Sequence, residues 1–191
     1  MVNIVLFGAP GCGKGTQAQR LKEHYGIHHV STGEVIRGEI ARGTELGKRM
    51  ESYIREGKLA PDEIVIDMIA NYVAEHKEAK GCIFDGFPRT TRQAEEFDRI
   101  LAGHGLKVDL MVDIHVPEEE LVKRILLRGK DSGRADDASE EVIRGRIEVY
   151  RRQTQVVADF YAKQDKYADV DGVGSMDEVF DRIRAVIDRK L

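Results

Sequence analysis

Cysteine is scarce in this sequence. The 191 residues include only Cys12 and Cys82, and these two form no CxxC pair. A disulfide framework requires an even set of spaced cysteines, and a cysteine-rich zinc site requires closely spaced thiols, so the sequence supports neither. We therefore expect no zinc. Because the N-terminus carries no signal-peptide pattern, we expect a protein of the reducing cytoplasm.

An excess of positive charge and long apolar runs are also missing. The net charge is −4 and the isoelectric point is about 5.9. A general nucleic-acid binder needs a basic face to neutralise phosphates, so this composition argues against nucleic acid as a partner. The apolar runs are far too short to cross a bilayer, and we expect no membrane partner. Without repeats, low-complexity tracts or linkers, the length fits one domain.

What the sequence does contain is an alternation of short apolar runs with longer stretches of helical periodicity. The candidate strands are residues 2–7, 28–30, 82–85, 110–115 and 167–170, and a helical pattern follows each of them. Such a βαβ rhythm predicts a mostly parallel sheet that helices cover on both faces.

Several residues mark the starts of helices. Ser31 followed by Glu34 fits a capping box. Pro61 and Pro117 fit first-turn positions, and the acidic residues after each of them suit a helix N-terminus. Apolar residues at spacings of seven and four predict one long amphipathic helix, with Ile143, Ile147, Tyr150, Val157 and Tyr161 on its buried face.

The stretch GAPGCGKGT, residues 8–16, places four glycines around Lys14 directly behind the first apolar run. Glycine costs entropy on folding, so a cluster this dense indicates that something approaches the backbone closely. A strand, a glycine loop and a helix start aim several N–H groups at one point, which favours a polyphosphate. In the general GxxxxGK[ST] pattern a serine or threonine follows the lysine directly, whereas here Gly15 follows it and the hydroxyl comes one residue later, at Thr16. This departure leaves open whether the hydroxyl of Thr16 contacts Mg²⁺ directly.

A second motif, FDGFPRT at residues 84–90, places Asp85 at the end of a predicted strand and Arg89 four residues later. Parallel sheets bind ligands at this edge. A carboxylate there can hold Mg²⁺ directly or through water, and a guanidinium can bind a second phosphate through two nitrogens. The alternatives are a helix cap for Asp85 and a surface ion pair for Arg89.

Seven stretches together give the sequence its likeness to a known family. They are GAPGCGKGTQ, STGEVIR, GKLAPDEIV, FDGFPRTTRQ, SGRADD, RIEVY and VDGVGS, and they run nearly from end to end. The sequence resembles the adenylate kinases, which belong to the nucleoside monophosphate kinase family. The resemblance implies an α/β fold of three layers, α/β/α, of the P-loop type, with a five-stranded parallel sheet and a single domain over residues 1–191.

The resemblance also divides this domain. The core would comprise residues 1–31, 61–127 and 139–191. Two small mobile inserts would cover the substrates, an NMP-binding insert over residues 32–60 and a lid over residues 128–138. The lid would be the short kind, because the segment lacks the room and the ligands of the longer, often zinc-bearing lid. Glycines in the two inserts suit movement, at Gly33, Gly38, Gly43, Gly47, Gly57, Gly129 and Gly133.

The activity implied by the resemblance is reversible, Mg²⁺-dependent phosphoryl transfer from ATP to AMP, which gives two ADP. The partners would be these small nucleotides, and we expect a monomer. For in-line transfer between two nucleotides, the protein must align the reacting groups, neutralise the phosphate charges and exclude water from the site. No general base is needed, because the phosphate of AMP is already anionic at neutral pH. Asp85 would hold Mg²⁺ through water.

Site residues carry over from the family motif by motif. The catalytic side chains would be Lys14, Arg89, Arg124, Arg134 and Arg146. ATP would bind Gly11, Cys12, Gly13, Lys14, Gly15, Thr16, Arg124, Arg128 and Gly174. AMP would bind Thr32, Gly33, Arg37, Lys58, Leu59, Ala60, Gly86, Phe87, Pro88, Arg89, Gln93, Arg134 and Arg146. The spacing of four residues independently places Arg124 and Arg128 on one helix face.

The choice of AMP as acceptor depends on two of these residues. In the family, the positions of Thr32 and Gln93 face the adenine of AMP, and a hydroxyl and an amide can read its hydrogen-bonding edge. Thr32 could instead have only a structural role next to the helix cap, and Gln93 could be an ordinary exposed helix residue. A kinase for UMP or CMP is therefore the alternative within the enzyme class.

Outside the enzyme class, the alternative is a nucleotide-dependent switch protein, although the NKxD motif expected of a guanine-nucleotide switch is absent.

A few other cysteine, aspartate and histidine side chains were considered for chemical roles. The N–H groups and Lys14 around Cys12 suggest a thiol with a lowered pKa that reacts readily. We interpret Asp136 and Asp137 as partners of nearby arginines in lid closure. No acidic or thiol residue stands at ligand spacing from His24, His28 and His29, so we expect surface or strand-edge positions for them.

Overall fold

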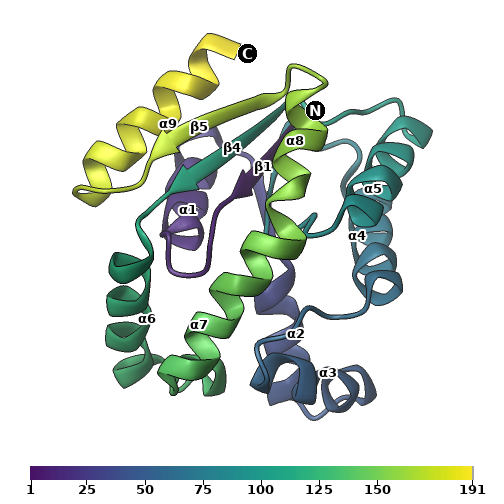
Figure 1. Ribbon diagram of the computed structural model, residues 1–191. Coiled ribbons are helices and arrows are strands. Elements are labelled where there is room, and N and C mark those ends of the chain that lie inside the picture. Colours follow the sequence, from purple (N-terminus) through teal and green to yellow (C-terminus); the bar gives the residue numbers. More distant parts are fainter. Residues whose placement is uncertain (191) are drawn as a thin grey trace.

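The five predicted strands form one parallel sheet in the computed structural model, which describes residues 1–190 (Figure 1). The strands are β1 (Val2–Phe7), β2 (His28–Ser31), β3 (Gly81–Asp85), β4 (Leu110–His115) and β5 (Tyr167–Asp171). They lie in the order β2-β3-β1-β4-β5, so β1 is central. The sequence patterns located every strand to within one residue at each end.

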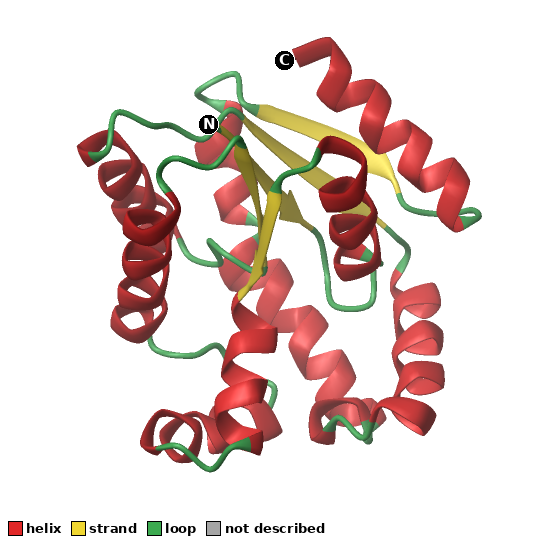
Figure 2. Ribbon diagram, turned by 180° about the vertical axis from the view of Figure 1, so that it is seen from behind, coloured by secondary structure: helices red, strands yellow, loops and turns green. Residues whose placement is uncertain are grey.

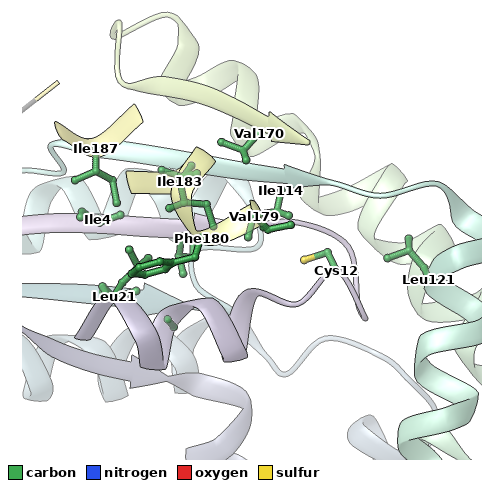
Figure 3. Close-up of a cluster of buried hydrophobic side chains, with 14 of the residues drawn as sticks. Ile4, Cys12, Leu21, Ile114, Leu121, Val170, Val179, Phe180, Ile183 and Ile187 are labelled. Atoms are coloured by element: carbon green, nitrogen blue, oxygen red, sulfur yellow. The ribbon is translucent and has the colours of Figure 1, made fainter. Parts of the chain in front are cut away.

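The apolar side chains of the strands divide between the two faces of the sheet. Along β1, Ile4 and Leu6 belong to one buried cluster, and Val5 and Phe7 belong to the other. Strands buried on both faces read as continuous apolar runs, and this is why their short stretches stood out in the sequence. Figure 3 shows the first cluster, in which side chains of the C-terminal helix pack on the sheet.

Helices cover both faces, as the βαβ rhythm predicts (Figures 1 and 2). α1 (Lys14–Tyr25) and α9 (Met176–Lys190) contribute to the first cluster, and α4 (Asp62–His76), α5 (Thr91–Gly103) and α8 (Val156–Ala162) contribute to the second. α6 (Glu118–Ser132) and α7 (Glu140–Val149) extend beyond the sheet past its carboxyl end. Within residues 1–190, we find no helix with the length and apolar character that a membrane span requires.

The two segments expected to be inserts lie at this same end of the molecule (Figure 1). The first contains α2 (Thr32–Ala41) and α3 (Glu45–Arg55). The second differs from a simple polar loop, because α6 continues to Ser132 and a 3₁₀ turn follows at Ala135–Asp137. The residues of this segment outside helices are the two between these elements and Ala138 after the turn.

The helix ends agree with the start signals in part. The Ser31 hydroxyl accepts a hydrogen bond from the backbone N–H of Glu34 at 3.3 Å, so Ser31 caps α2 as predicted. Pro61 and Pro117 stand one position earlier than predicted, because each is the cap residue before the first turn. A proline there still costs no hydrogen bond.

The long amphipathic helix predicted from Ile143 onward is interrupted. α7 ends at Val149, a π-helical turn spans Tyr150–Thr154, and α8 begins at Val156. The apolar residues on both sides of the turn fit a helical spacing, so the wider turn leaves no trace in the sequence pattern. Turns of this type are rare and occur frequently at functional sites.

The insert glycines do not all mark flexible joints. Gly43, Gly57 and Gly133 have positive φ and lie outside helices, but the other four lie within α2, α3 or α6. A Cβ at Gly47 would lie 2.2 Å from the carbonyl oxygen of Glu39, so this glycine allows α2 and α3 to pack closely. The interpretation of all seven as signs of movement was therefore too broad.

Candidate active site

The loop after β1 leads into an exposed helix start, since Gly13, Gly15 and Thr16 are all exposed. Gly13 precedes the first turn of α1 with φ 95°, and no side chain of the described residues caps this helix end. A Cβ at Gly13 would meet no atom within 4 Å. The first N–H groups of a helix have no partner within it, and the helix dipole favours negative charge there. This uncapped helix start is the arrangement that the predicted anion cradle requires.

Asp85 lies beside this cradle at the end of β3. A Cβ at Gly15 would lie 3.6 Å from Oδ2 of Asp85, and the residue is 6% exposed. Burial raises the pKa of Asp85, but the nearby His29 ring and the charges of Lys14 and Arg89 outweigh burial, so the pKa falls below its usual 3.8. Asp85 is therefore ionised at neutral pH.

His29 lies on the edge strand β2, as expected, but the fold also brings it close to a carboxylate. Its Nε2 atom lies 3.5 Å from Oδ2 of Asp85, and its side chain is 11% exposed. The parallel register pairs His29 with Ile83 and Ser31 with Asp85, which brings the ring diagonally against the carboxylate. The two residues are distant in the sequence, so spacing along the chain could not reveal their contact.

A cavity opens between the cradle and the first insert, and we call it the central cavity. Lys14 lines it from the start of α1. All but one of the residues predicted to bind AMP line it as well: Thr32, Gly33, Arg37, Lys58, Leu59, Ala60, Gly86, Phe87, Pro88, Arg89, Gln93 and Arg146. Arg134 is the exception.

The wall of the central cavity also includes residues that sequence reasoning missed. Ile36, Ile54 and Val65 form an apolar part of the lining, and Val149, Tyr150 and Thr154 approach from the end of α7 and the π-helical turn. The first three stand next to other apolar residues in or just after a largely polar insert, and these apolar positions were an available signal. The other three depend on the course of the chain at the interrupted helix, which the sequence did not reveal.

Thr32 and Gln93 are buried in the wall, and protein groups already engage their polar atoms. The Thr32 hydroxyl donates to the carbonyl of Gly86 at 2.9 Å. The Gln93 amide donates to Oδ1 of Asp62 at 2.8 Å and accepts from the N–H of Arg89 at 2.8 Å. Gln93 is 2% exposed, so it is not an ordinary exposed helix residue. Both side chains shape the loop around Arg89.

Arginine side chains converge near the open side of the central cavity. Burial and then the charge of Arg134 lower the pKa of Arg37 to about 10, and burial and then the charge of Arg128 lower the pKa of Arg134. Arg89 donates from Nε to the carbonyl of Gly86 at 2.7 Å. Cations crowded in this way favour an anionic ligand between them.

Two aspartates balance part of this positive charge. Asp137 accepts two hydrogen bonds from Arg128, at 2.6 and 2.8 Å, and one from Arg146 at 2.8 Å. A carboxylate oxygen of Asp136 lies 3.3 Å from Arg146. The prediction that these aspartates pair with nearby arginines is confirmed, and the pairs join the end of α6 to α7.

Residues predicted to bind ATP lie mostly outside the central cavity. Of that set only Lys14 lines it. Arg124 on α6 donates to Glu120 at 2.9 Å and to the carbonyl of Gly172 at 3.3 Å, next to the loop that contains Gly174. The structure therefore separates the predicted nucleotide residues into two groups, which meet at Lys14.

Cys12 differs from expectation. It is 2% exposed and belongs to the buried cluster drawn in Figure 3. Burial raises the pKa of its thiol more than the charge of Lys14 lowers it. The hypothesis of an activated thiol was wrong, because the side chain points into the core while the backbone of the loop faces the cradle.

Metal ligands were sought over the same described residues. Within residues 1–190, no three His, Cys, Asp or Glu side chains form a group that could hold a metal ion. The carboxylate of Asp85 lies beside the start of α1, where a Cβ at Gly15 would be 3.6 Å from its Oδ2 atom. Mg²⁺ commonly needs only one or two carboxylates when phosphate oxygens complete its ligands.

Comparison with known proteins gives consistent matches. The family model for adenylate kinase matches residues 6–166. The chain is 52% identical over 189 residues to an adenylate kinase of Bacteroides thetaiotaomicron, with 99% of this chain and 100% of the relative covered. It is 48% identical over 189 residues to that of Maricaulis maris, with the same coverage. This chain belongs to the adenylate kinase family.

Proposed function

We propose that this chain transfers a phosphoryl group from ATP to AMP, giving two ADP, and that the transfer takes place between Lys14 and Arg89. Membership of the adenylate kinase family supports the reaction. The observation that carries the placement is the arrangement of cations. Lys14 and Arg89 both line the central cavity, and Lys14 also stands at the helix start beside the anion cradle.

The central cavity is the proposed site of AMP. Its apolar lining by Ile36, Ile54 and Val65 suits the faces of a nucleobase. Arg37 and Arg89 suit the phosphate, because a guanidinium can bind two phosphate oxygens at once. Thr32 and Gln93 hold the surrounding loop through their own hydrogen bonds, so we propose that they orient the base pocket as well as touching adenine.

ATP is proposed to bind on the other side of Lys14. The backbone N–H groups of residues 11–16 would hold its phosphates, with Lys14 at the terminal phosphates. Arg124, Arg128 and Gly174 would surround the rest of the nucleotide. Arg134 and Arg146 would neutralise charge on the transferring group, because they stand with Asp136 and Asp137 at the border of the two sites.

Mg²⁺ fits beside this cradle. Asp85 is ionised, and Oδ2 has room in front of it because residue 15 is glycine. We propose that Asp85 holds the ion through water, while the exposed hydroxyl of Thr16 lies in the adjacent first turn of α1. When bound, the ion supplies charge neutralisation at the phosphates. Nε2 of His29 lies 3.5 Å from the same carboxylate oxygen.

The chain's own residues account for the other demands of the reaction. The arginines neutralise the phosphate charge that would otherwise keep two anions apart. The two inserts, residues 32–60 and 128–138, are proposed to close over the nucleotides and exclude water, which prevents hydrolysis of ATP. We also propose that the protein works as a monomer in the cytoplasm; sedimentation at assay concentration would test the first part.

The testing experiment measures ADP formation from MgATP with AMP, CMP, UMP, dTMP or GMP added singly, and with no acceptor. We expect strong acceleration by AMP alone. A preference for UMP or CMP would mean that the acceptor is a pyrimidine monophosphate, and the proposed mechanism of transfer would stand. If no monophosphate raised the rate above slow hydrolysis, the transfer function would be refuted and a nucleotide switch would explain the cradle better.

A further inference from the structure

A buried carboxylate lies directly behind one wall of the central cavity. Asp113 on β4 is 1% exposed. Its Oδ1 atom accepts a hydrogen bond from the Tyr150 hydroxyl at 3.3 Å, and its Oδ2 atom accepts one from the Tyr167 hydroxyl at 3.1 Å. Nε2 of His115 lies 3.3 Å from Oδ2. A carboxylate this deeply buried is costly unless such donors satisfy it.

Tyr150 connects this carboxylate to the nucleotide site. It is the first residue of the π-helical turn, and it lines the central cavity together with Val149 and Thr154. Its ring also packs against Phe7, with 5.4 Å between the ring centroids. The ring is therefore fixed at one side by Phe7 and at its hydroxyl end by Asp113.

The turn itself needs support from outside. A π-helical turn is less favourable than a regular helix, and it persists where tertiary contacts hold it. Along Tyr150–Thr154, the Tyr150 hydroxyl donates to the strand beneath, and Thr154 is 4% exposed at the cavity wall. The hydrogen bond to Asp113 thus anchors the turn that brings two wall residues to the cavity.

We propose that Asp113 is a positioning residue for the acceptor nucleotide, because its carboxylate holds Tyr150 and the π-helical turn in the geometry that forms this wall of the AMP site. The inference rests on the proposed function for the identity of the ligand. It assigns to Asp113 no contact with either nucleotide. Its effect passes through Tyr150 and Thr154.

If Asp113 had a purely structural role, losing either of its tyrosine partners would have the same effect on AMP binding. Tyr167 distinguishes this role from the proposed positioning role. Tyr167 on β5 donates to the same carboxylate but does not line the central cavity. Removing its hydroxyl weakens the tie between β4 and β5 and leaves the Tyr150 contact in place. Tyr167→Phe is therefore the matched control for Tyr150→Phe.

The experiment measures kcat, the KM for AMP and the KM for ATP in Asp113→Asn, Tyr150→Phe, Tyr167→Phe and the double variant Asp113→Asn/Tyr150→Phe. Weakening of the hydrogen bond between Tyr150 and residue 113 in Asp113→Asn, and its loss in Tyr150→Phe, are each expected to raise the KM for AMP, by about fivefold in Tyr150→Phe. The KM for ATP should change much less. The double variant should be no worse than the more affected single variant, because both changes act on the same contact.

Calorimetric binding of AMP to each variant gives the same comparison without turnover. Tyr167→Phe should bind AMP like the wild type while unfolding at a lower temperature. An unchanged KM for AMP in Tyr150→Phe, or equal effects of Tyr150→Phe and Tyr167→Phe, would overturn the proposal. Equal rises in the KM for both nucleotides would also overturn it. If Asp113→Asn does not fold, the pair of tyrosine variants decides alone.

The wild type, measured first, keeps this test apart from the test of the proposed function. Without acceleration by AMP in the wild type, the proposed function fails before any variant is compared. With acceleration, the function stands, and only the comparison of variants bears on Asp113.

Discussion

Arg89 shows how much one side chain contributes at the scale of the residue. Its Nε donates to the carbonyl of Gly86 at 2.7 Å, and its backbone N–H donates to Gln93. Both contacts fix the guanidinium at the cavity wall, so that its two remaining nitrogens can face a phosphate. A lysine in this place would keep the charge and lose the fixed direction.

Arg89→Lys is therefore expected to raise the KM for AMP about tenfold, because a lysine binds phosphate through one nitrogen only. Steady-state kinetics with AMP varied at saturating MgATP measures this change. Arg92→Lys is the control, since Arg92 is an exposed neighbour paired with Glu63 at 2.7 Å. A KM that rises equally in both variants would contradict the role of Arg89.

Cys12 provides a second expectation at this scale. Because burial raises the pKa of its thiol, alkylation by iodoacetamide should be much slower than that of a free thiol. The rate should be the same with and without ATP, and it should rise only when the protein unfolds. Mass spectrometry of the labelled peptide distinguishes Cys12 from Cys82. Rapid labelling that ATP prevents would restore the hypothesis of an exposed, activated thiol.

At the scale of elements, the decisive contact joins α6 to α7. Burial raises the pKa of Asp137, but the hydrogen bonds and charges of Arg128 and Arg146 lower it more, so it lies below its usual 3.8. Such a carboxylate stabilises the fold at a pH above its unfolded pKa, and this contribution is lost as the pH falls through the folded value. The ion pairs of Asp137 with Arg128 and Arg146 thus link α6 to α7 at neutral pH.

Asp137→Asn should lower the free energy of unfolding by about 2 kcal/mol at neutral pH, because three charge-assisted hydrogen bonds are weakened. The difference from the wild type should shrink as the pH falls below about 3.8. Urea titrations across this pH range measure it, with Asp131→Asn at an exposed position near the end of α6 as the control. A difference that is constant with pH would show that charge is not the cause.

Elements also show where sequence reasoning succeeded and where it stopped. Apolar runs located all five strands, because buried parallel strands leave a continuous signal that one chain segment carries by itself. The contact of His29 with Asp85 depends on the register of two strands, and the burial of Cys12 depends on which way one loop residue turns. The π-helical turn changes the backbone without changing the periodicity. Each of these is set by packing between segments.

At the scale of the whole molecule, the structure has its two inserts close together. A Cβ at Gly57 would lie 2.6 Å from Cγ of Arg146, so the end of the first insert touches α7. Arg37 and Arg134 come near enough to lower the pKa of Arg37. Without phosphate between them, these cations repel one another, and the repulsion favours separation of the inserts.

Small-angle scattering should therefore show a smaller radius of gyration when an inhibitor that joins two adenosines through a polyphosphate is bound. Added salt should compact the nucleotide-free protein slightly, because it screens the repulsion of the arginines. An unchanged radius with and without the inhibitor would contradict closure. Labels placed in the two inserts would report the same movement as a distance.

The position of the two chain ends has a practical consequence for such work. Figure 1 shows the start of β1 and the end of α9 on the side of the sheet opposite to α2 and α3, and the backbone N–H of Val2 donates there to the carbonyl of Lys80 at 2.9 Å. A surface tether attached at the end of α9 would thus hold the molecule far from the two proposed inserts. Single molecules could be immobilised in that way and watched through many turnovers, with the proposed inserts left free in solution.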